Sequence, residues 1–259
     1  MKSGFLAIAC ALTASSPAFA AEVIVNTVAG LPSATTWGTL PGEDTGGGAR
    51  TAVTSTVARS GVGSLELFGD RDRAQIGIQY AVGRTNLGSL SDAKSLTFDW
   101  RIAGGSTNPY NADYTPALRL LFQDGSTNTR KELIWEGAYN NVYGTINRDQ
   151  WYTSSATDLF YITGGSVNEG HTISYWASTL DPHSTVSGLS VGVGSGATSV
   201  YNAFADNVTF ATSLGTTVYN FEPASAVPEP ATWAMMLVGF GGVGVAMRRR
   251  KTKASMSYA

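Results

Sequence analysis

Apolar and polar residues alternate with a two-residue period along several short stretches of this chain. The clearest stretch is 95–102, in which the apolar residues are Leu96, Phe98, Trp100 and Ile102. Similar alternation occurs in 75–80, 118–123, 132–136, 188–194 and 201–210. Successive side chains of a strand point to opposite faces, so this period predicts strands with one buried face. Turns rich in glycine and serine separate the stretches, which predicts an antiparallel β-sandwich.

One segment has a helical period instead. Its apolar residues recur at i, i+3, i+4 and i+7 and are Ile173, Trp176, Ala177 and Leu180. Pro182 follows directly after Asp181 and is expected to stop the helix. We therefore predict one short helix at 172–180, packed over one end of the sandwich.

The C-terminal end has a different character. An uncharged run of 17 residues, 231–247, is followed by Arg248, Arg249, Arg250 and Lys251. This length is the lower limit for a helix that crosses a hydrocarbon core of about 30 Å. A buried core helix is the alternative, but such a helix is seldom followed at once by four cations. We predict a transmembrane helix at 231–247 and a basic cytoplasmic tail at 248–259.

The N-terminal end has the three parts of a secretory signal peptide. Lys2 supplies the positive start, 5–12 is apolar, and Ala18-Phe19-Ala20 is a small-x-small cleavage site. Removal after about Ala20 would discard Cys10, the single cysteine of the chain. The mature protein is then expected to contain no disulfide, although the export route would permit one.

The motif at the tail resembles a known family. Pro228, Glu229 and Pro230, then Trp233 and Ala234, then the apolar span and the arginines resemble the PEP-CTERM sorting signal in its PEP-x-x-W-A form. The resemblance implies a Gram-negative bacterium that makes exopolysaccharide. It also implies a membrane-embedded exosortase as partner, which recognises and cleaves the tail. The expected route is an inner-membrane-anchored precursor that is then placed at the cell surface or outside the cell.

These ends define the expected domain organisation. Residues 1–20 are the signal peptide, 21–221 the β-sandwich, and 222–230 a Pro/Ala linker that carries the motif. The segment 21–227 contains 11 Lys and Arg against 18 Asp and Glu, a net charge of −7. A nucleic-acid partner is not expected, because such a partner needs a basic face.

Two segments of the body resemble the closing strands of jelly-roll domains of the carbohydrate-binding and lectin-like type. They are 188–196, which ends in Gly194-Ser195-Gly196, and 205–209, which contains Asp206-Asn207-Val208. The resemblance covers about 25 residues. It implies a jelly-roll fold more than an activity, because unrelated jelly rolls end in the same way.

Catalytic patterns are weak throughout the chain. Ser190 stands in a G-x-S-x-G sequence, but the strand continues past it and no helix follows, as a nucleophile elbow requires. His171 and His183 are the only histidines, too few for a zinc site without cysteines. Glu132 and Glu136 would lie about 13 Å apart on one strand, which is too far for glycosidase geometry. We expect no catalytic residue.

Asp206 is the one candidate for a metal ligand. The alternation in 201–210 places it on the same face as Phe204, Val208 and Phe210, and that face is expected to be buried. A buried carboxylate must be paired or bound to a cation. Asp206 is therefore expected either to accept hydrogen bonds from backbone N–H groups, an arginine or a tryptophan, or to bind a structural Ca²⁺ ion.

Aromatic residues are concentrated between 135 and 176. Many of them are expected to fill the core, but the sequence 137–144 is typical of a loop, whose rings could be exposed. Tyr139, Tyr143 and Trp151 are the candidates for carbohydrate binding, since sugar rings stack on aromatic side chains.

The expected function is that of an exported, non-catalytic protein that associates with exopolysaccharide or binds carbohydrate. A structural protein of the biofilm matrix with no discrete site is the alternative. A polysaccharide-active hydrolase or lyase is the third possibility.

Overall fold

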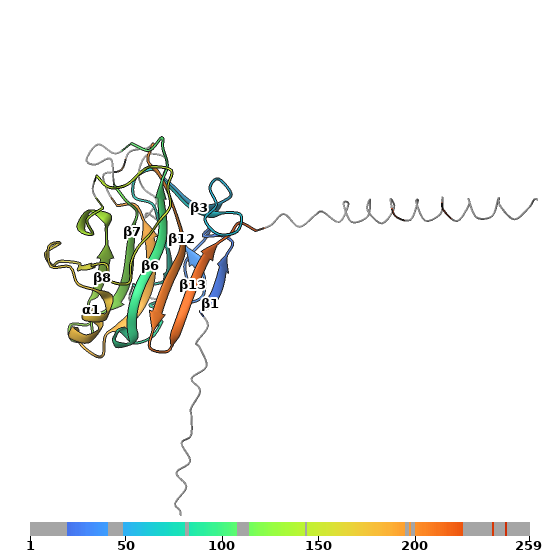
Figure 1. Cartoon of the computed structure of the whole chain (residues 1–259). Coiled ribbons are helices and arrows are strands. Elements are labelled where there is room, and N and C mark those ends of the chain that lie inside the picture. The colour runs from blue at the N-terminus through green and yellow to red at the C-terminus, as the bar shows by residue number, and fades with distance from the viewer. Residues whose placement is uncertain are drawn as a thin grey trace, which may run out of the picture. The chain divides into compact units, whose positions relative to one another are not determined.

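The computed structural model describes residues 20–40, 49–80, 83–107, 114–142, 144–194, 197, 200–224, 240 and 247. The chain divides into two units, Met1–Pro223 and Ala224–Ala259. The first unit is a sandwich of two β-sheets (Figure 1).

The first sheet has seven strands. Its order is β1-β13-β12-β4-β3, and β6 and β9 extend from β12. The bounds are β1 Ala21–Val25, β3 Arg50–Thr54, β4 Ser64–Phe68, β6 Ala93–Ile102, β9 Tyr152–Thr153, β12 Asn202–Thr212 and β13 Gly215–Phe221. β12 is the central strand, because β6 pairs along one edge while β4 and β13 pair with its two halves. The pairing of β1 with β13 is parallel, unlike the others described in this sheet.

The second sheet has six strands in the order β10-β8-β7-β11-β5-β2. The bounds are β2 Trp37–Gly38, β5 Arg73–Gly77, β7 Ala117–Gln123, β8 Arg130–Trp135, β10 Tyr161–Ile162 and β11 Thr185–Gly192. All five pairings described in this sheet are antiparallel. The chain crosses repeatedly between sheets, since β4, β6 and β12 belong to the first and β5, β7 and β11 to the second.

The core lies between the two sheets and follows the predicted alternation. Leu96, Phe98, Trp100 and Ile102 of β6 are all buried, as are Leu133 and Trp135 of β8. Phe98 and Trp135 meet edge to face, with ring centroids 5.1 Å apart. This geometry confirms the prediction of an all-β sandwich.

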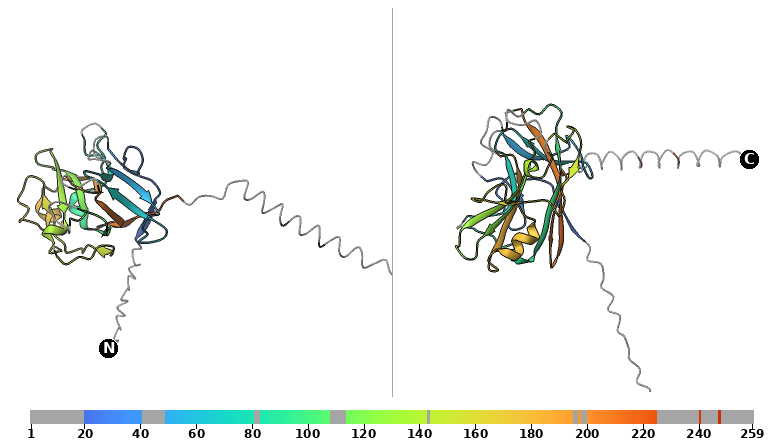
Figure 2. Two further views of the ribbon diagram at one scale, coloured as in Figure 1. Left: turned by 90° about the horizontal axis from the view of Figure 1, so that it is seen from above. Right: turned by 60° about the vertical axis from the view of Figure 1, so that its left-hand side comes forward.

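The α-helix α1 spans Ile173–Thr179. The Thr172 side chain caps its N-terminus by accepting a hydrogen bond from the Tyr175 N–H. Ile173 and Ala177 are buried, and Figure 2 shows the helix at one end of the sandwich. The helix was predicted at this place. Two short 3₁₀ turns, η1 (Leu90–Asp92) and η2 (Gly137–Tyr139), lie in the same unit.

The expected burial of Asp206 is confirmed, but the prediction that it shares one face of β12 with Phe204, Val208 and Phe210 is wrong. Ala203 and Ala205 face the core, whereas Phe204 and Asp206 lie on the other face of the strand. The register against β6 then shifts between Asp206 and Thr209, where Asn207 adopts a positive φ of 49°. This β-bulge turns Val208 and Phe210 toward the core. Odd-numbered residues of β12 therefore face the core before the bulge, and even-numbered residues face it after the bulge.

The predicted ends of the chain fall outside the described part. The signal peptide, the sorting motif Pro228–Glu229–Pro230 with Trp233 and Ala234, and the basic cluster Arg248–Lys251 lie outside it. So does the span 231–247, apart from Phe240 and Met247. Among described residues, no helix has both the length and the apolar character needed to cross a membrane.

Candidate binding face on the six-stranded sheet

The outer face of the six-stranded sheet carries polar residues on strands that are distant in sequence. Ser190 of β11 pairs with Gln75 of β5 on one side and with Arg119 of β7 on the other. Two residues earlier in β11, and on the same face, Gly188 pairs with Gly77 of β5 and with Leu121 of β7. Gly188 and Ser190 have small side chains. The outer surface over β11 therefore projects less than the surface over Gln75 of β5 and Arg119 of β7.

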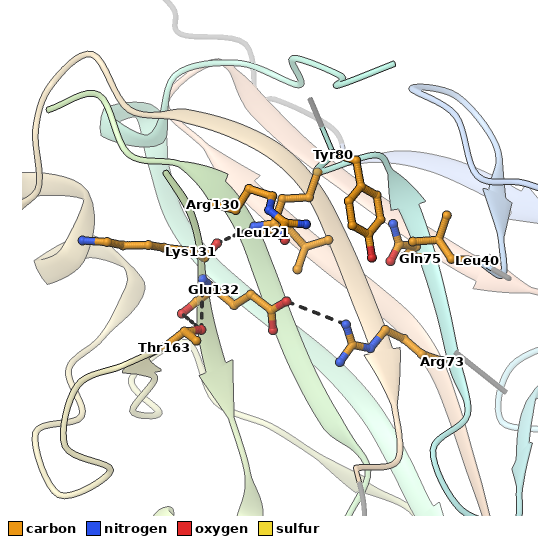
Figure 3. Close-up of a pocket in the computed structure, with 10 residues that line it drawn as sticks. Leu40, Arg73, Gln75, Tyr80, Leu121, Arg130, Lys131, Glu132 and Thr163 are labelled. Carbon is orange, nitrogen blue, oxygen red and sulfur yellow. Dashed lines mark hydrogen bonds and ion pairs between the residues drawn. The ribbon is translucent and has the colours of Figure 1, made fainter. Parts of the chain in front are cut away.

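A pocket of about 250 Å³ opens on this face. We call it the arginine pocket, and its polar lining includes Arg73, Gln75, Tyr80, Arg130, Glu132 and Thr163. Figure 3 shows Arg73 and Glu132 reaching toward each other across it, whereas Lys131 points away. The Lys131 ammonium group pairs instead with Asp124, at 2.7 Å. The charged groups that face the pocket are therefore mainly guanidinium groups.

Glu132 is shared between two arginines. Its Oε1 lies 3.7 Å from Arg73 Nη1, and its Oε2 lies 3.6 Å from Arg119 Nε. Charge-assisted hydrogen bonds between such groups are about 2.7–2.9 Å long. Both contacts are therefore ion pairs without a hydrogen bond, and one carboxylate serves two cations.

Arg119 is buried under this face. Its exposed fraction is 5%, and burial, followed by the nearby charge of Arg73, lowers the pKa of its guanidinium to about 10. Among the described residues, neither its Nε nor its Nη1 has a hydrogen-bond partner. The hydroxyl of Ser190, which is also fully buried, lacks a partner there as well. Unsatisfied buried donors are costly, so this polar environment needs an explanation.

A second pocket lies on the same side of the sheet. We call it the tyrosine pocket; it measures about 260 Å³ and is lined by Tyr139, Asn141, Leu159, Tyr161, Val167 and Asn168. The Tyr161 hydroxyl hydrogen-bonds to Glu136, and burial raises the pKa of both groups. Glu136 in turn feels the charge of Arg119. Electrostatic interactions therefore extend from Glu132 at the arginine pocket through Arg119 and Glu136 to Tyr161 at the tyrosine pocket.

The predicted carbohydrate-binding residues are distributed over two places. Tyr139 lies in η2, directly after β8, and its ring packs edge to face on Tyr161, with centroids 5.5 Å apart. Trp151 precedes β9 of the other sheet, where its Nε1 donates to the Ala58 carbonyl. The Arg59 guanidinium lies over the Trp151 ring, 5.9 Å from the centroid. Tyr143 lies outside the described residues.

Asp206 is held by backbone groups. Its Oδ1 accepts hydrogen bonds from the N–H groups of Asn207 (2.8 Å) and Phe221 (2.9 Å), and its Oδ2 accepts one from Ser60 (3.3 Å). This is the first of the two expected arrangements. No group of three or more His, Cys, Asp or Glu side chains that could hold a metal ion occurs in the described ranges.

Burial raises the pKa of Asp206 to about 6, despite the three backbone N–H groups that lower it. In the unfolded chain the pKa is about 3.9. A raised carboxyl pKa contributes stability below about pH 4, and this contribution is lost as the pH rises through 6. We expect Asp206 to lower the unfolding free energy by on the order of 3 kcal/mol between pH 4 and pH 7.

The variant Asp206→Asn tests this expectation. It should lose stability at pH 4, since the amide nitrogen cannot accept the Ser60 hydrogen bond, but it should lack the decline toward pH 7. Urea unfolding between pH 4 and pH 8 measures both effects, with Glu169→Gln, which removes an exposed carboxyl, as the control. The same decline in wild type and Asp206→Asn would contradict the assignment.

Of the residues in the weak catalytic patterns, Ser190 and Glu132 both adjoin Arg119. Ser190 lies within β11, with strand on both sides of it. His171 stacks on Tyr175 next to α1, with centroids 3.8 Å apart. Glu132 and Glu136 flank Arg119 and are engaged with it.

Sequence reasoning missed the arginines of this face. Arg119 stands between the buried residues Leu118 and Leu120, so its outward direction could be read from the alternation. The sequence does not show that Arg119 is buried or that it lies near Arg73, because both facts depend on β11 lying between β5 and β7.

Comparison with known proteins adds information at the tail. Residues 226–251 match the family model of the PEP-CTERM protein-sorting motif. No curated protein matches the chain. The matched segment contains Pro228, Glu229, Pro230, Trp233 and Ala234 and extends to the basic cluster. The chain therefore carries a PEP-CTERM sorting signal, which marks it as an exported protein sorted by an exosortase.

Proposed function

We propose that the sandwich is a non-catalytic glycan-binding module, which holds the exported protein in exopolysaccharide outside the cell. The tyrosine pocket is the observation that supports this proposal. Tyr139 keeps 38% of its surface exposed there although it packs against Tyr161. An exposed ring beside amide groups suits a sugar, which offers C–H groups on its ring face and hydroxyls at its edge.

The loop that carries Tyr139 is held in place. Asn140 donates to the carbonyls of Glu136 and Leu159 and accepts a hydrogen bond from the Leu159 N–H. The amide of Asn140 is thereby used for structure, whereas exposed Asn141 and Asn168 line the pocket. A ring presented on a braced loop loses little conformational entropy on binding.

The absence of catalysis is part of this proposal. Glycoside hydrolysis needs two carboxyl groups that face one bond, one as acid and one as base or nucleophile. On this face Glu132 engages Arg73 and Arg119, and Glu136 engages Tyr161 and Arg119. Both carboxyl groups therefore already have partners within the protein, and the proposal assigns them a structural role.

The test is retention of the full-length protein on a panel of immobilised neutral and acidic polysaccharides. We expect Tyr139→Ala to weaken binding about tenfold, equivalent to roughly 1.4 kcal/mol. Trp151→Ala is the matched control, because its ring is engaged by Arg59 and Ala58 at the other sheet.

Lack of retention on every polymer would contradict the proposal and favour a structural matrix protein without a discrete site. Release of reducing ends from any polymer would instead identify an enzyme.

A further inference from the structure

We infer that the arginine pocket binds the carboxylate groups of an acidic glycan, such as a polyuronate. The inference rests on the proposed function and names the chemical class of its ligand.

The first argument is the local charge. Arg73 and Arg130 line the pocket together with Glu132. Arg119 lies buried beneath them, within ion-pair distance of Glu132 and close enough to Glu136 to interact with its charge. The segment 21–227 as a whole carries a net charge of −7. A net positive face on a strongly acidic body selects an anionic ligand locally, while the overall charge disfavours nucleic acid.

The second argument is the state of Arg119. A guanidinium group presents its donors as a planar fork that matches a carboxylate with two parallel hydrogen bonds. Arg119 is 95% buried, yet its Nε and Nη1 have no hydrogen-bond partner among the described residues. The nearest carboxylate, Glu132, stands 3.6 Å from Nε and is shared with Arg73. Nε and Nη1 lie on different edges of the guanidinium, so a ligand carboxylate would supply an acceptor for one of these two donors.

The third argument is the arrangement of the two pockets. Thr163 lines the arginine pocket and Tyr161 lines the tyrosine pocket. These residues are two positions apart, or about 7 Å in extended chain. A short oligosaccharide can therefore stack one ring on Tyr139 while an adjacent uronate reaches the arginines.

The test compares polygalacturonate with the same polymer after methyl esterification, which removes the charge and keeps the backbone. We expect the full-length protein to bind the acidic polymer at least about tenfold more tightly, and salt to weaken only that binding. Arg130→Gln, at an exposed position, should weaken binding to the acidic polymer severalfold without affecting the fold. Arg119→Gln should weaken it about tenfold or more.

Glu132→Gln separates a binding role from a structural one. It removes the carboxylate that competes for Arg73 and Arg119, so it should strengthen binding to the acidic polymer. Tyr139→Ala should weaken binding to both polymers by the same factor.

Equal affinity for the two polymers would overturn this inference and leave the proposed function standing. Acidic binding that is unchanged in Arg119→Gln and Arg130→Gln would also overturn it, as would equally tight binding of double-stranded DNA. Failure to bind either polymer, together with the neutral members of the panel, would remove the proposed function itself.

Discussion

Gly77→Ala is expected to destabilise the sandwich by about 3 kcal/mol or more. Gly77 ends β5 with a φ of 83°, a conformation that costs an L-residue roughly 1–2 kcal/mol. A Cβ there would overlap the Ser187 carbonyl oxygen and come within 2.8 Å of Gly188 Cα. The clash is with backbone on both counts, so β5 and β11 would have to separate at the floor of the binding face.

Gly164→Ala is the matched control. Gly164 has the same φ of 83°, but no atom lies within 4 Å of its Cβ position. The free energy of unfolding of Gly164→Ala should fall by only about 1 kcal/mol, the cost of placing an L-residue at a positive φ. Urea unfolding of both variants measures the difference. Equal losses at the two positions would show that β5 and β11 are not in close contact at Gly77.

Replacement of Pro228, Glu229 and Pro230 together by alanine is expected to block sorting almost completely. The three residues lie within the matched sorting signal, and the apolar span and basic cluster would be unchanged. The precursor should therefore still enter the membrane but remain there at full length. Immunoblots of membrane, surface and medium fractions measure its distribution.

Pro223→Ala is the control for this triple variant, because Pro223 lies outside the matched segment 226–251. It should be distributed like the wild type. Normal release of the triple variant would mean that residues 228–230 do not direct sorting.

The sequence predicted the strands that alternate apolar and polar residues. In β6 and β8 the side that faces the core is buried and the other side is partly open. β7 and β11 were also found as strands, but nearly all of their residues are buried on both faces. β1 lacks this signal, since four of its five residues are exposed and its pairing with β13 is parallel. Helix α1 was predictable because its period and its stop at Asp181-Pro182 are both local features.

The face of Asp206 could not be predicted from period alone. Asn207 inserts one residue in the left-handed region and reverses the parity of β12. Asparagine tolerates that conformation better than most residues, but the sequence does not indicate that it is used here.

The candidate binding face was only partly predictable. Tyr139 was named as a candidate because it stands in a loop-like sequence, and its role stays a prediction. The arginine pocket combines side chains from β5 and β8 above β7 and β11, and their neighbourhood follows from pairing between segments far apart in the chain. Long-range register of this kind leaves no local signature.

The central claim is that the C-terminal tail is a sorting signal, which an exosortase removes during sorting. Mass spectrometry of the protein recovered from the cell surface and medium tests it most directly. We expect a C-terminus at or near 227–234 and no peptide from the basic cluster 248–251. Recovery of released protein that still contains Arg248 and the residues after it would contradict the account.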